Sequence, residues 1–380
     1  MGEIGRRKFV ALAGGACAAA FAGCIRFPGK ASVPNVQLIG AGKAQFPIIL
    51  SSNENPLGPC PSAIEAGSKS VAVSSHRYAR EQRDGLIMDL AEFYRLSRDQ
   101  ILLGCGAIEL LKIAVDVFCS SDKPPIISDP VYEAIDYFAG LKHVHPLKIP
   151  AKSHDTGHDL EAMLEALYSR GGGMVYVCNP CNPTGGVLDS EELADFIVKA
   201  PRDVVVVVDE AYAEYVGPDF LSCFDYVRSG MPNLLVIRTF SKVYGLAGLR
   251  VGYCAGSREL LGAMAGHRLW NNINQAGAAA AREALNDQDW VERVRRENKK
   301  AKQMFCAGLK KLGVDYIPSK TSFVLLSARR PWEEIYAFLR SHGIIGGRRI
   351  PSMPRHIRLS IGSSEEMAYC LKVLEKFVSL

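Results

Sequence analysis

Five consecutive valines at residues 204–208 are the feature that most constrains how this chain can fold. A strand with one face in solvent alternates apolar and polar residues, whereas a strand covered on both faces is apolar throughout. The run is β-branched and contains no polar residue, so it predicts a central strand with helices on both sides of its sheet. Asp209 and Glu210 follow directly and place two carboxylates at the carboxyl end of that strand.

Strand and helix signals alternate around this run, from about residue 100 to 260. Further strands are predicted in "QILL", "PPIISDP", "MVYVC", "NLLVIRT" and "LRVGYCAG", and helices in "AIELLKIAVDVF" and "LDSEELADFIVKA". The second helix has Asp189 at its N-cap and Glu192 at the capping-box position. Strands separated by helices indicate an α/β fold with a mainly parallel sheet.

The pattern changes after about residue 285. A long amphipathic helix, ended by Gly313, precedes short strands in "SFVLLSA" and "HIRLSIG". We therefore predict a large domain at 76–285 and a smaller α+β domain at 286–380, which an N-terminal arm at 31–75 joins. The smaller domain is thus built from both ends of the chain. With 380 residues, 48% of them hydrophobic, the chain is long enough for both domains.

Composition argues against two kinds of partner. The net charge of +5 is small, and the densest basic run, residues 293–303, alternates with polar residues as on an exposed helix face. The eleven cysteines include one close pair, Cys178 and Cys181, with no second pair and no histidine at ligand spacing nearby. We therefore expect neither a nucleic-acid partner nor a bound metal.

The first 30 residues are typical of an export signal. Arg6 and Arg7 precede a stretch of mostly small apolar residues, 10–23, that is too short to span a membrane. The arginine pair resembles a twin-arginine signal. "FAGC", ending at Cys24, resembles a lipoprotein cleavage box, although Phe stands where Leu is commoner. These features predict an exported protein that is either free in the periplasm or attached to the membrane by a lipid on Cys24. The alternative is an N-terminal extension of a cytoplasmic enzyme.

Polar or glycine-rich groups follow four of the predicted strands. They are Asp209, Lys242, Asn182 and the loop at 104–107. In an open α/β sheet, ligands collect outside the carboxyl ends of the strands. We therefore expect these groups to share one ligand site.

The chemistry of these groups indicates one kind of ligand. A lysine that loses its proton easily suits a Schiff base with an aldehyde. A carboxylate such as Asp209 keeps a heterocyclic nitrogen protonated, and a glycine-rich turn into a helix binds phosphate. The Thr239 and Ser241 hydroxyls and the Arg250 guanidinium add hydrogen bonds for the same phosphate. An aldehyde, a pyridine nitrogen and a phosphate together describe pyridoxal 5′-phosphate.

These residues lie in motifs that resemble the fold-type I, class I/II aminotransferases, and most of all the histidinol-phosphate aminotransferase branch. In family order the motifs are "SSNENPLGP" (51–59), "HRYA" (76–79), "GCGAIELL" (104–111), "CNPCNPTG" (178–185), "VVDEAYAEY" (207–215), "RTFSKVYGLAGLRVGY" (238–253) and "IRLSIG" (357–362). The resemblance implies a seven-stranded, mainly parallel sheet in the large domain and pyridoxal 5′-phosphate as cofactor. It also implies transfer of an amino group from an amino acid or an amino-alcohol phosphate to a 2-oxo acid such as 2-oxoglutarate.

The resemblance assigns roles around the cofactor ring. Lys242 is the covalent anchor and the proton shuttle, and Asp209 pairs with the ring nitrogen. Asn182 and Tyr212 bond the phenolic oxygen, and Tyr132 stacks on the ring. Lys242, Asp209 and Tyr212 are thus the predicted catalytic residues.

Further residues are assigned to the phosphate and to the substrate. Tyr78 reaches the phosphate in the partner subunit, which implies a homodimer with shared active sites. Arg358 binds the substrate carboxylate, for which a planar guanidinium is suited, and Asn55 is the second predicted substrate residue. The remaining phosphate ligands are the backbone of Gly106, Ala107 and Ile108 and the side chains of Thr239, Ser241 and Arg250.

The sequence departs from the family in places that concern the substrate. Ile108 stands where the family usually has Asp, so only its backbone can serve. Relatives carry an arginine for the substrate phosphate where this chain has Gly346 and Gly347, and Arg348 and Arg349 follow one and two positions late. Two alternatives stay open: a decarboxylase of the phosphothreonine type with the same cofactor, and a non-catalytic exported binding lipoprotein.

Overall fold

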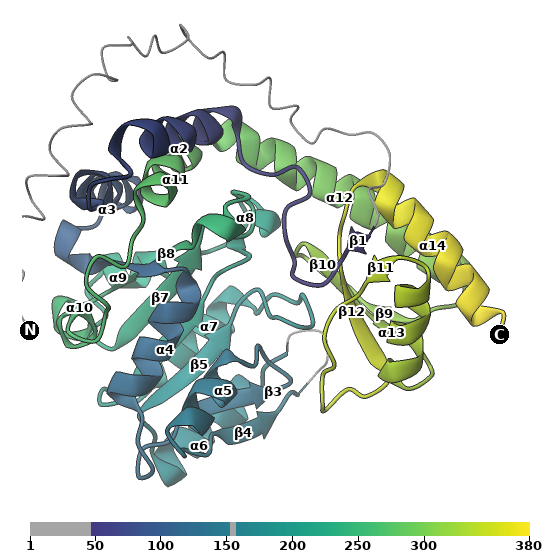
Figure 1. The fold of residues 1–380 in the computed structure, drawn as a ribbon. Helices are drawn as coiled ribbons and strands as arrows, with labels where there is room; N and C mark the ends of the chain where they lie inside the picture. The colour runs from purple at the N-terminus through teal and green to yellow at the C-terminus, as the bar shows by residue number, and fades with distance from the viewer. Residues whose placement is uncertain (1–46, 153–156) are drawn as a thin grey trace, which may run out of the picture. The chain divides into compact units, whose positions relative to one another are not determined.

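The computed structural model describes residues 47–152 and 157–380, and its centre is a seven-stranded sheet (Figure 1). The strands, in their order across the sheet, are β2 (Ile101–Cys105), β8 (Val251–Gly256), β7 (Leu234–Thr239), β6 (Val205–Asp209), β5 (Met174–Cys178), β3 (Ile126–Asp129) and β4 (Leu147–Pro150). All neighbouring pairs are parallel except the two that β8 makes with β2 and β7. The predicted α/β fold with a mainly parallel sheet is confirmed.

Helices cover both faces of this sheet. One face carries α4 (Ala107–Phe118), α5 (Ala134–Leu141) and α10 (Arg258–Ala265). The other carries α3 (Arg80–Tyr94), α6 (Leu160–Arg170), α7 (Ser190–Lys199), α8 (Ala213–Val216), α9 (Phe224–Arg228) and α11 (Gln275–Asn286). Two short 3₁₀ helices, η1 (Arg98–Gln100) and η2 (Ala247–Leu249), precede β2 and β8.

The valine run is buried as the sequence predicts. Val206 and Val208 pack into the core on one side of the sheet, and Val205 and Val207 into the core on the other. Alternate side chains of a strand point to opposite faces, so a strand between two helical layers needs apolar residues at every position. The run ends at Asp209, the last residue of β6.

The segment after α11 builds a second, smaller sheet. It contains α12 (Gln288–Lys311), β9 (Tyr316–Ile317), β10 (Phe323–Ser327), α13 (Trp332–Ser341), β11 (Ile344–Ile345), β12 (His356–Ser360) and α14 (Ser364–Val378). β10 pairs antiparallel with both β9 and β12. A third core, separate from the two around the large sheet, lies between these elements.

The start of the described chain reaches this C-terminal segment. β1 (Ile48–Ile49) pairs in parallel with β11. The next helix, α2 (Pro61–Ser74), instead packs against α11, and Figure 1 shows the two helices side by side. β1 and β11 form a separate two-stranded sheet, and the loop between β1 and α2 leads from it to the helices on the large sheet. Whether domains divide at 75 and 285 stays a prediction, and the signal-like residues 1–30 lie outside the described residues.

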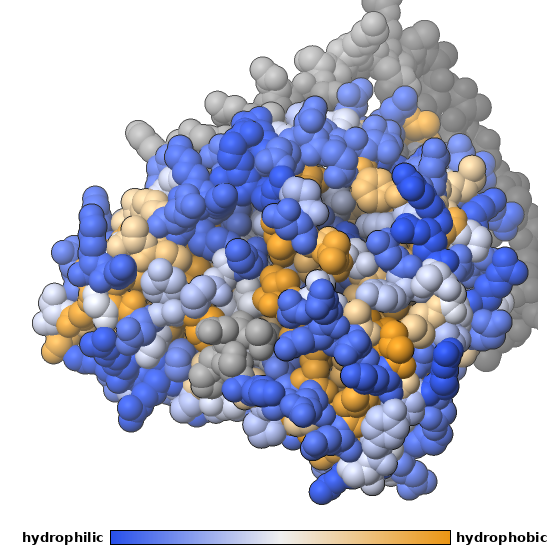
Figure 2. All heavy atoms as spheres, turned by 180° about the vertical axis from the view of Figure 1, so that it is seen from behind, coloured by the Kyte–Doolittle hydropathy of each residue, from blue (hydrophilic) through white to orange (hydrophobic). Residues whose placement is uncertain are grey.

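Seen from behind, hydrophilic side chains cover most of the surface, with smaller hydrophobic patches between them (Figure 2). Within the described residues, no helix is both long enough and apolar enough to cross a membrane.

Candidate active site

The predicted strand-end groups do lie at one edge of the large sheet. Asp209 ends β6, Asn182 follows β5, and Lys242 follows β7. Because β8 runs antiparallel to both β2 and β7, β2 has the same direction as β7. The glycine turn after β2, at Gly106, therefore opens at the same edge as the other three groups.

Lys242 is half-buried and points towards the loop after β1. Its Nζ donates to the carbonyl oxygen of Ser52 at 2.8 Å and lies 5.7 Å from the centre of the Tyr212 ring. Burial lowers the pKa of Lys242 from 10.5 to about 8, and the neighbouring Arg358 charge adds to this effect. A lysine with a depressed pKa has a larger neutral fraction near neutral pH, and only the neutral amine is a nucleophile.

Asp209 is a buried carboxylate with both oxygens bonded. Oδ1 accepts from the backbone N–H of Ala211 at 3.0 Å, and Oδ2 accepts from the Tyr176 hydroxyl at 2.8 Å. Burial raises the pKa of Asp209 to about 6, whereas these two hydrogen bonds and the Lys242 charge lower it. Asp209 is thus a buried carboxyl group whose two hydrogen bonds favour its ionised form against the effect of burial.

Arg250 and Gly106 form a cradle beside the start of α4. Gly106 has φ +73°, and a Cβ at this position would lie 2.4 Å from Nη2 of Arg250. The guanidinium also reaches the Ser241 hydroxyl at 3.5 Å, and Thr239 Oγ1 accepts from the Ser241 N–H at 3.1 Å. No side chain caps the N-terminus of α4, so its first N–H groups, beginning with that of Ala107, can serve an anion.

Arg358 brings the small sheet into contact with the same edge. It is buried in β12, and its Nη1 donates to Oδ1 of Asn182, while Nη2 donates to the carbonyl oxygen of Ser51 at 2.9 Å. Its Nε is buried and has no hydrogen-bond partner among the described residues. A buried donor without a partner is costly, so this atom indicates a place for an acceptor from a ligand.

The sequence comparison decides which protein class has this arrangement. The chain matches the sequence model of the family Aminotransferase class I and II over residues 47–374. The chain belongs to this family.

Individual relatives of this aminotransferase are histidinol-phosphate aminotransferases. The chain is 38% identical to histidinol-phosphate aminotransferase 1 of Nitrosococcus oceani over 327 residues, which cover 86% of this chain and 87% of the relative. It is 35% identical to the enzyme of Brevibacillus brevis over 335 residues, covering 87% and 90%. Among solved structures, the Sinorhizobium meliloti enzyme in complex with pyridoxal-5′-phosphate has a TM-score of 0.81 at 27% identity, covering 88% of this chain and 91% of its own.

The aminotransferase site fits pyridoxal 5′-phosphate at three points. The Gly106–Arg250 cradle and the uncapped α4 suit the phosphate, since a Cβ would fill the cradle. Asp209 suits a protonated ring nitrogen, and Lys242, with its depressed pKa, suits the aldehyde. Pyridoxal 5′-phosphate is therefore the cofactor of this aminotransferase.

The remaining predicted residues differ in position. Tyr132 is half-buried, and burial together with the Asp209 charge raises its pKa. Tyr78 is 79% exposed on the surface of its own subunit. Asn55 donates Nδ2 to the carbonyls of Val243 and Gly58 at 2.8 and 3.1 Å. These bonds hold the loop beside Lys242, and the binding of substrate by Asn55 stays a prediction.

The sequence analysis missed two polar residues of the site. Asn53, two positions before Asn55, donates from Nδ2 to the Tyr212 hydroxyl at 2.8 Å, and its backbone N–H donates to Ser360 Oγ. Tyr176 bonds Asp209. A signal for Tyr176 was present, because a single tyrosine in an otherwise aliphatic strand, two positions before the strand end, places a hydroxyl near that end.

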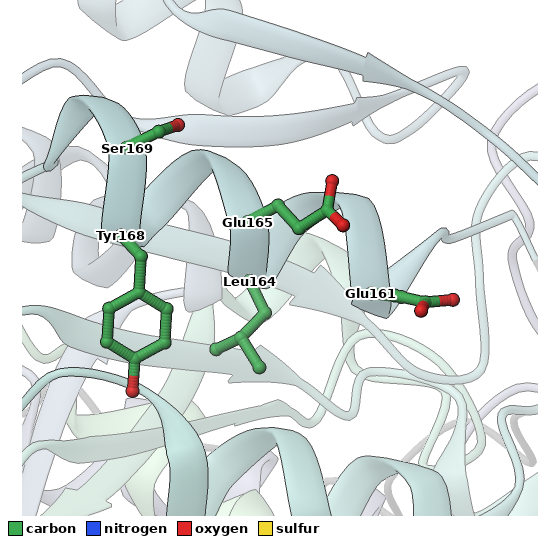
Figure 3. A pocket seen from close by; sticks show the side chains of 5 residues that line it. All are labelled: Glu161, Leu164, Glu165, Tyr168 and Ser169. Carbon is green, nitrogen blue, oxygen red and sulfur yellow. The ribbon is translucent and has the colours of Figure 1, made fainter.

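Another hollow in the molecule does not belong to this site. It measures about 520 Å³ and lies on α6, lined by Glu161, Leu164, Glu165, Tyr168 and Ser169 (Figure 3). It is open to solvent, and none of the residues discussed above lines it. Within 47–152 and 157–380, no three His, Cys, Asp or Glu side chains gather as metal ligands would.

Proposed function

We propose that this aminotransferase takes its amino group from histidinol phosphate, or from a closely similar phosphorylated amine, and passes it to a 2-oxo acid such as 2-oxoglutarate. The names of the relatives support this donor. The observation that supports the proposal is the ion pair of Arg348 with Glu133, the residue that follows Tyr132.

Arg348 and Arg349 point to different surroundings. Arg348 forms an ion pair with Glu133, the residue after Tyr132, and its charge lowers the pKa of both Tyr132 and Arg358. Arg349 pairs with Glu333 on α13 at 3.4 Å. Arg348 is therefore the residue that would hold the donor phosphate, in place of the arginine that relatives carry earlier in this loop.

The site residues divide the work of transamination. The bound cofactor supplies an electron sink that makes the donor's α-proton acidic. Lys242 Nζ would hold the cofactor aldehyde covalently and, once the donor's amino group has displaced it, would accept and return the α-proton. Arg358 orients the acceptor carboxylate through its guanidinium fork. Asp209, a buried carboxylate, would keep the ring nitrogen protonated.

A donor screen with two matched variants tests the proposal. Histidinol phosphate, histidinol and aromatic amino acids are offered with 2-oxoglutarate. We expect Arg348→Ala to raise the KM for histidinol phosphate about 10- to 100-fold, as for a lost charge-assisted bond. Arg349→Ala, the control, changes it less than about twofold. Equal turnover of histidinol with and without phosphate would contradict the proposal, and release of CO₂ without a 2-oxo acid would point to the decarboxylase.

We also propose that the enzyme is a homodimer in which Tyr78 serves the partner's cofactor phosphate. Tyr78 is exposed, and Leu269 and Trp270, on the loop before α11, are 77% and 95% exposed. Large exposed apolar side chains are typical of an interface. Because each active site would take Lys242 from one subunit and Tyr78 from the other, a complementation test can be made.

The complementation test mixes two inactive variants, Lys242→Ala and Tyr78→Ala, by co-expression. In a mixed dimer one site has both Lys242 and Tyr78 intact, so mixed protein should recover about a quarter of the wild-type activity. Mixed protein as inactive as its two components would exclude shared sites.

Export of the enzyme is a further proposal, supported by the sequence of residues 1–30 alone. Replacing Arg6 and Arg7 together with lysines should keep the enzyme in the cytoplasm if a twin-arginine signal operates. Cys24→Ala should release it from the membrane fraction if Cys24 carries a lipid. Identical fractionation of wild type and both variants would support a cytoplasmic enzyme instead.

A further inference from the structure

Tyr176 is a buried tyrosine that the proposed roles do not use. It lies in β5, where Cys178 pairs with Asp209 of β6 across the parallel ladder. Residues two apart on a strand share a face, so Tyr176 points to the same side of the sheet as Cys178 and Asp209. Its ring packs in the core beneath α4 and α5, and its hydroxyl reaches Oδ2 of Asp209 at 2.8 Å.

We infer that Tyr176 is a positioning residue for the carboxylate that faces the cofactor ring, holding Asp209 in one orientation and in its ionised form. Each carboxylate oxygen has two acceptor positions. The Ala211 N–H and the Tyr176 hydroxyl occupy one on each oxygen, and they fix the carboxylate plane. A position remains free on the carboxylate for the ring N–H of the cofactor.

The charge balance around Asp209 explains why this bond matters. Burial alone drives the pKa of Asp209 upward, and the Tyr176 hydroxyl is the largest of the influences that lower it. The Lys242 charge also lowers the pKa of Asp209, but by less than the Tyr176 hydroxyl does. The other titratable groups that face Asp209 are Cys178 on β5, Tyr132 after β3, and Glu210 and Tyr212 after β6.

Removal of the Tyr176 hydroxyl should therefore favour the protonated carboxyl, which cannot pair with a protonated ring. The folded pKa of about 6 lies above the unfolded value of 3.8, so the ionised form is the one that burial disfavours. In wild type, affinity for pyridoxal 5′-phosphate should fall as the pH drops through about 6. In Tyr176→Phe that fall should begin at a higher pH.

The test measures the cofactor dissociation constant and the absorbance of the bound cofactor between pH 5 and 9. We expect Tyr176→Phe to weaken binding about 10- to 100-fold at pH 7, the effect of one hydrogen bond to a charged group. Tyr253→Phe is the matched control, because it removes a buried phenol contact of 2.6 Å, to Tyr94, that does not involve Asp209. An unchanged dissociation constant and pH midpoint in Tyr176→Phe would overturn the inference.

Two further variants keep the result unambiguous. In an Asp209→Asn background, Tyr176→Phe should have less than a twofold effect, because Tyr176 acts through Asp209. If Tyr176→Phe weakens cofactor binding as much in the Asp209→Asn background as in wild type, Tyr176 contributes only through packing. If Tyr176→Phe folds poorly, 3-fluorotyrosine at position 176 keeps the packing and is a stronger donor, so the pH midpoint should move down; an unmoved midpoint contradicts the inference.

The inference rests on the cofactor site and not on the identity of the amino donor. If Asp209→Asn itself binds pyridoxal 5′-phosphate like wild type, the assigned cofactor site fails. If Asp209→Asn is impaired and Tyr176→Phe is not, only the role of Tyr176 fails.

Discussion

The guanidinium of Arg358 donates a hydrogen bond to the amide oxygen of Asn182, which joins the small sheet to the strand-end loop of the large one. The sequence assigns these residues to different partners, Asn182 to the cofactor and Arg358 to the substrate. Because one hydrogen bond links them, a substitution at either residue should affect the binding of both the cofactor and the substrate.

Asn182→Ala should therefore impair substrate binding as well as cofactor binding. The variant removes the acceptor of Arg358 Nη1, so the guanidinium keeps only the hydrogen bond from Nη2 to Ser51. We expect the KM for 2-oxoglutarate to rise about tenfold, together with weaker binding of pyridoxal 5′-phosphate. Steady-state kinetics at saturating cofactor separate the two effects, and an unchanged KM would show that Arg358 needs no help from Asn182.

Gly106→Ala should displace the phosphate-binding arginine. The new Cβ would meet Nη2 of Arg250 at 2.4 Å, and the φ of +73° disfavours any side chain. We expect about a 10-fold or larger loss of cofactor affinity, measured by equilibrium titration of the apoprotein. Gly140→Ala is the control, since a Cβ there has no heavy atom within 4 Å, and it should leave affinity unchanged.

Lys242→Met should abolish transamination and yet stabilise the cofactor-free protein at neutral pH. The folded pKa of about 8 lies below the ordinary value of 10.5, so charging Lys242 opposes folding. This destabilisation is fully present below pH 8, declines between pH 8 and 10.5, and is absent above. Denaturant unfolding should give Lys242→Met an advantage of about 1–3 kcal/mol at pH 7. The same advantage at pH 7 and at pH 10.5 would show that packing, and not charge, is responsible.

Arg238→Met should be strongly destabilising. Arg238 is buried in β7 and bonds Glu210 twice, at 2.7 and 2.9 Å, and Glu214 at 3.2 Å. Without it two buried carboxylates face each other, and breaking such a group costs about 3–5 kcal/mol. Glu210→Gln and Glu214→Gln together should recover a large part of that loss. The exposed pair Lys199–Asp195 provides the control, and Lys199→Met should cost less than about 1 kcal/mol.

The strands of the large sheet and the residues at their ends could be predicted because their signals are local. The valine run must be buried on both faces, and the position of Asp209 at its end can be read from the sequence without knowledge of any tertiary contact. β4 was not predicted, because it has only four residues, none of them fully buried, and it lies at the sheet edge with one neighbour, β3. The reversed direction of β8 was not predicted either, since a strand pattern carries no direction.

The contacts between distant segments could not be predicted from the sequence. Asn53 and Asn55 stand in one motif and look equivalent, and only the fold shows that Asn53 reaches Tyr212 while Asn55 holds its own loop. The choice between Arg348 and Arg349 is of the same kind. The two side chains are adjacent in sequence, yet Arg348 pairs with Glu133 and Arg349 with Glu333, and only the fold shows this difference.

The parallel pairing of β1 with β11 has a consequence for the order in which the enzyme can be completed on the ribosome. β1 emerges long before its partner strand, because most of the described chain lies between the two. The carbonyl groups of Ser51 and Ser52 follow β1 directly and accept the bonds from Arg358 and Lys242. A nascent chain stopped before residue 344 should therefore hold the finished large sheet and still be unable to capture the cofactor firmly.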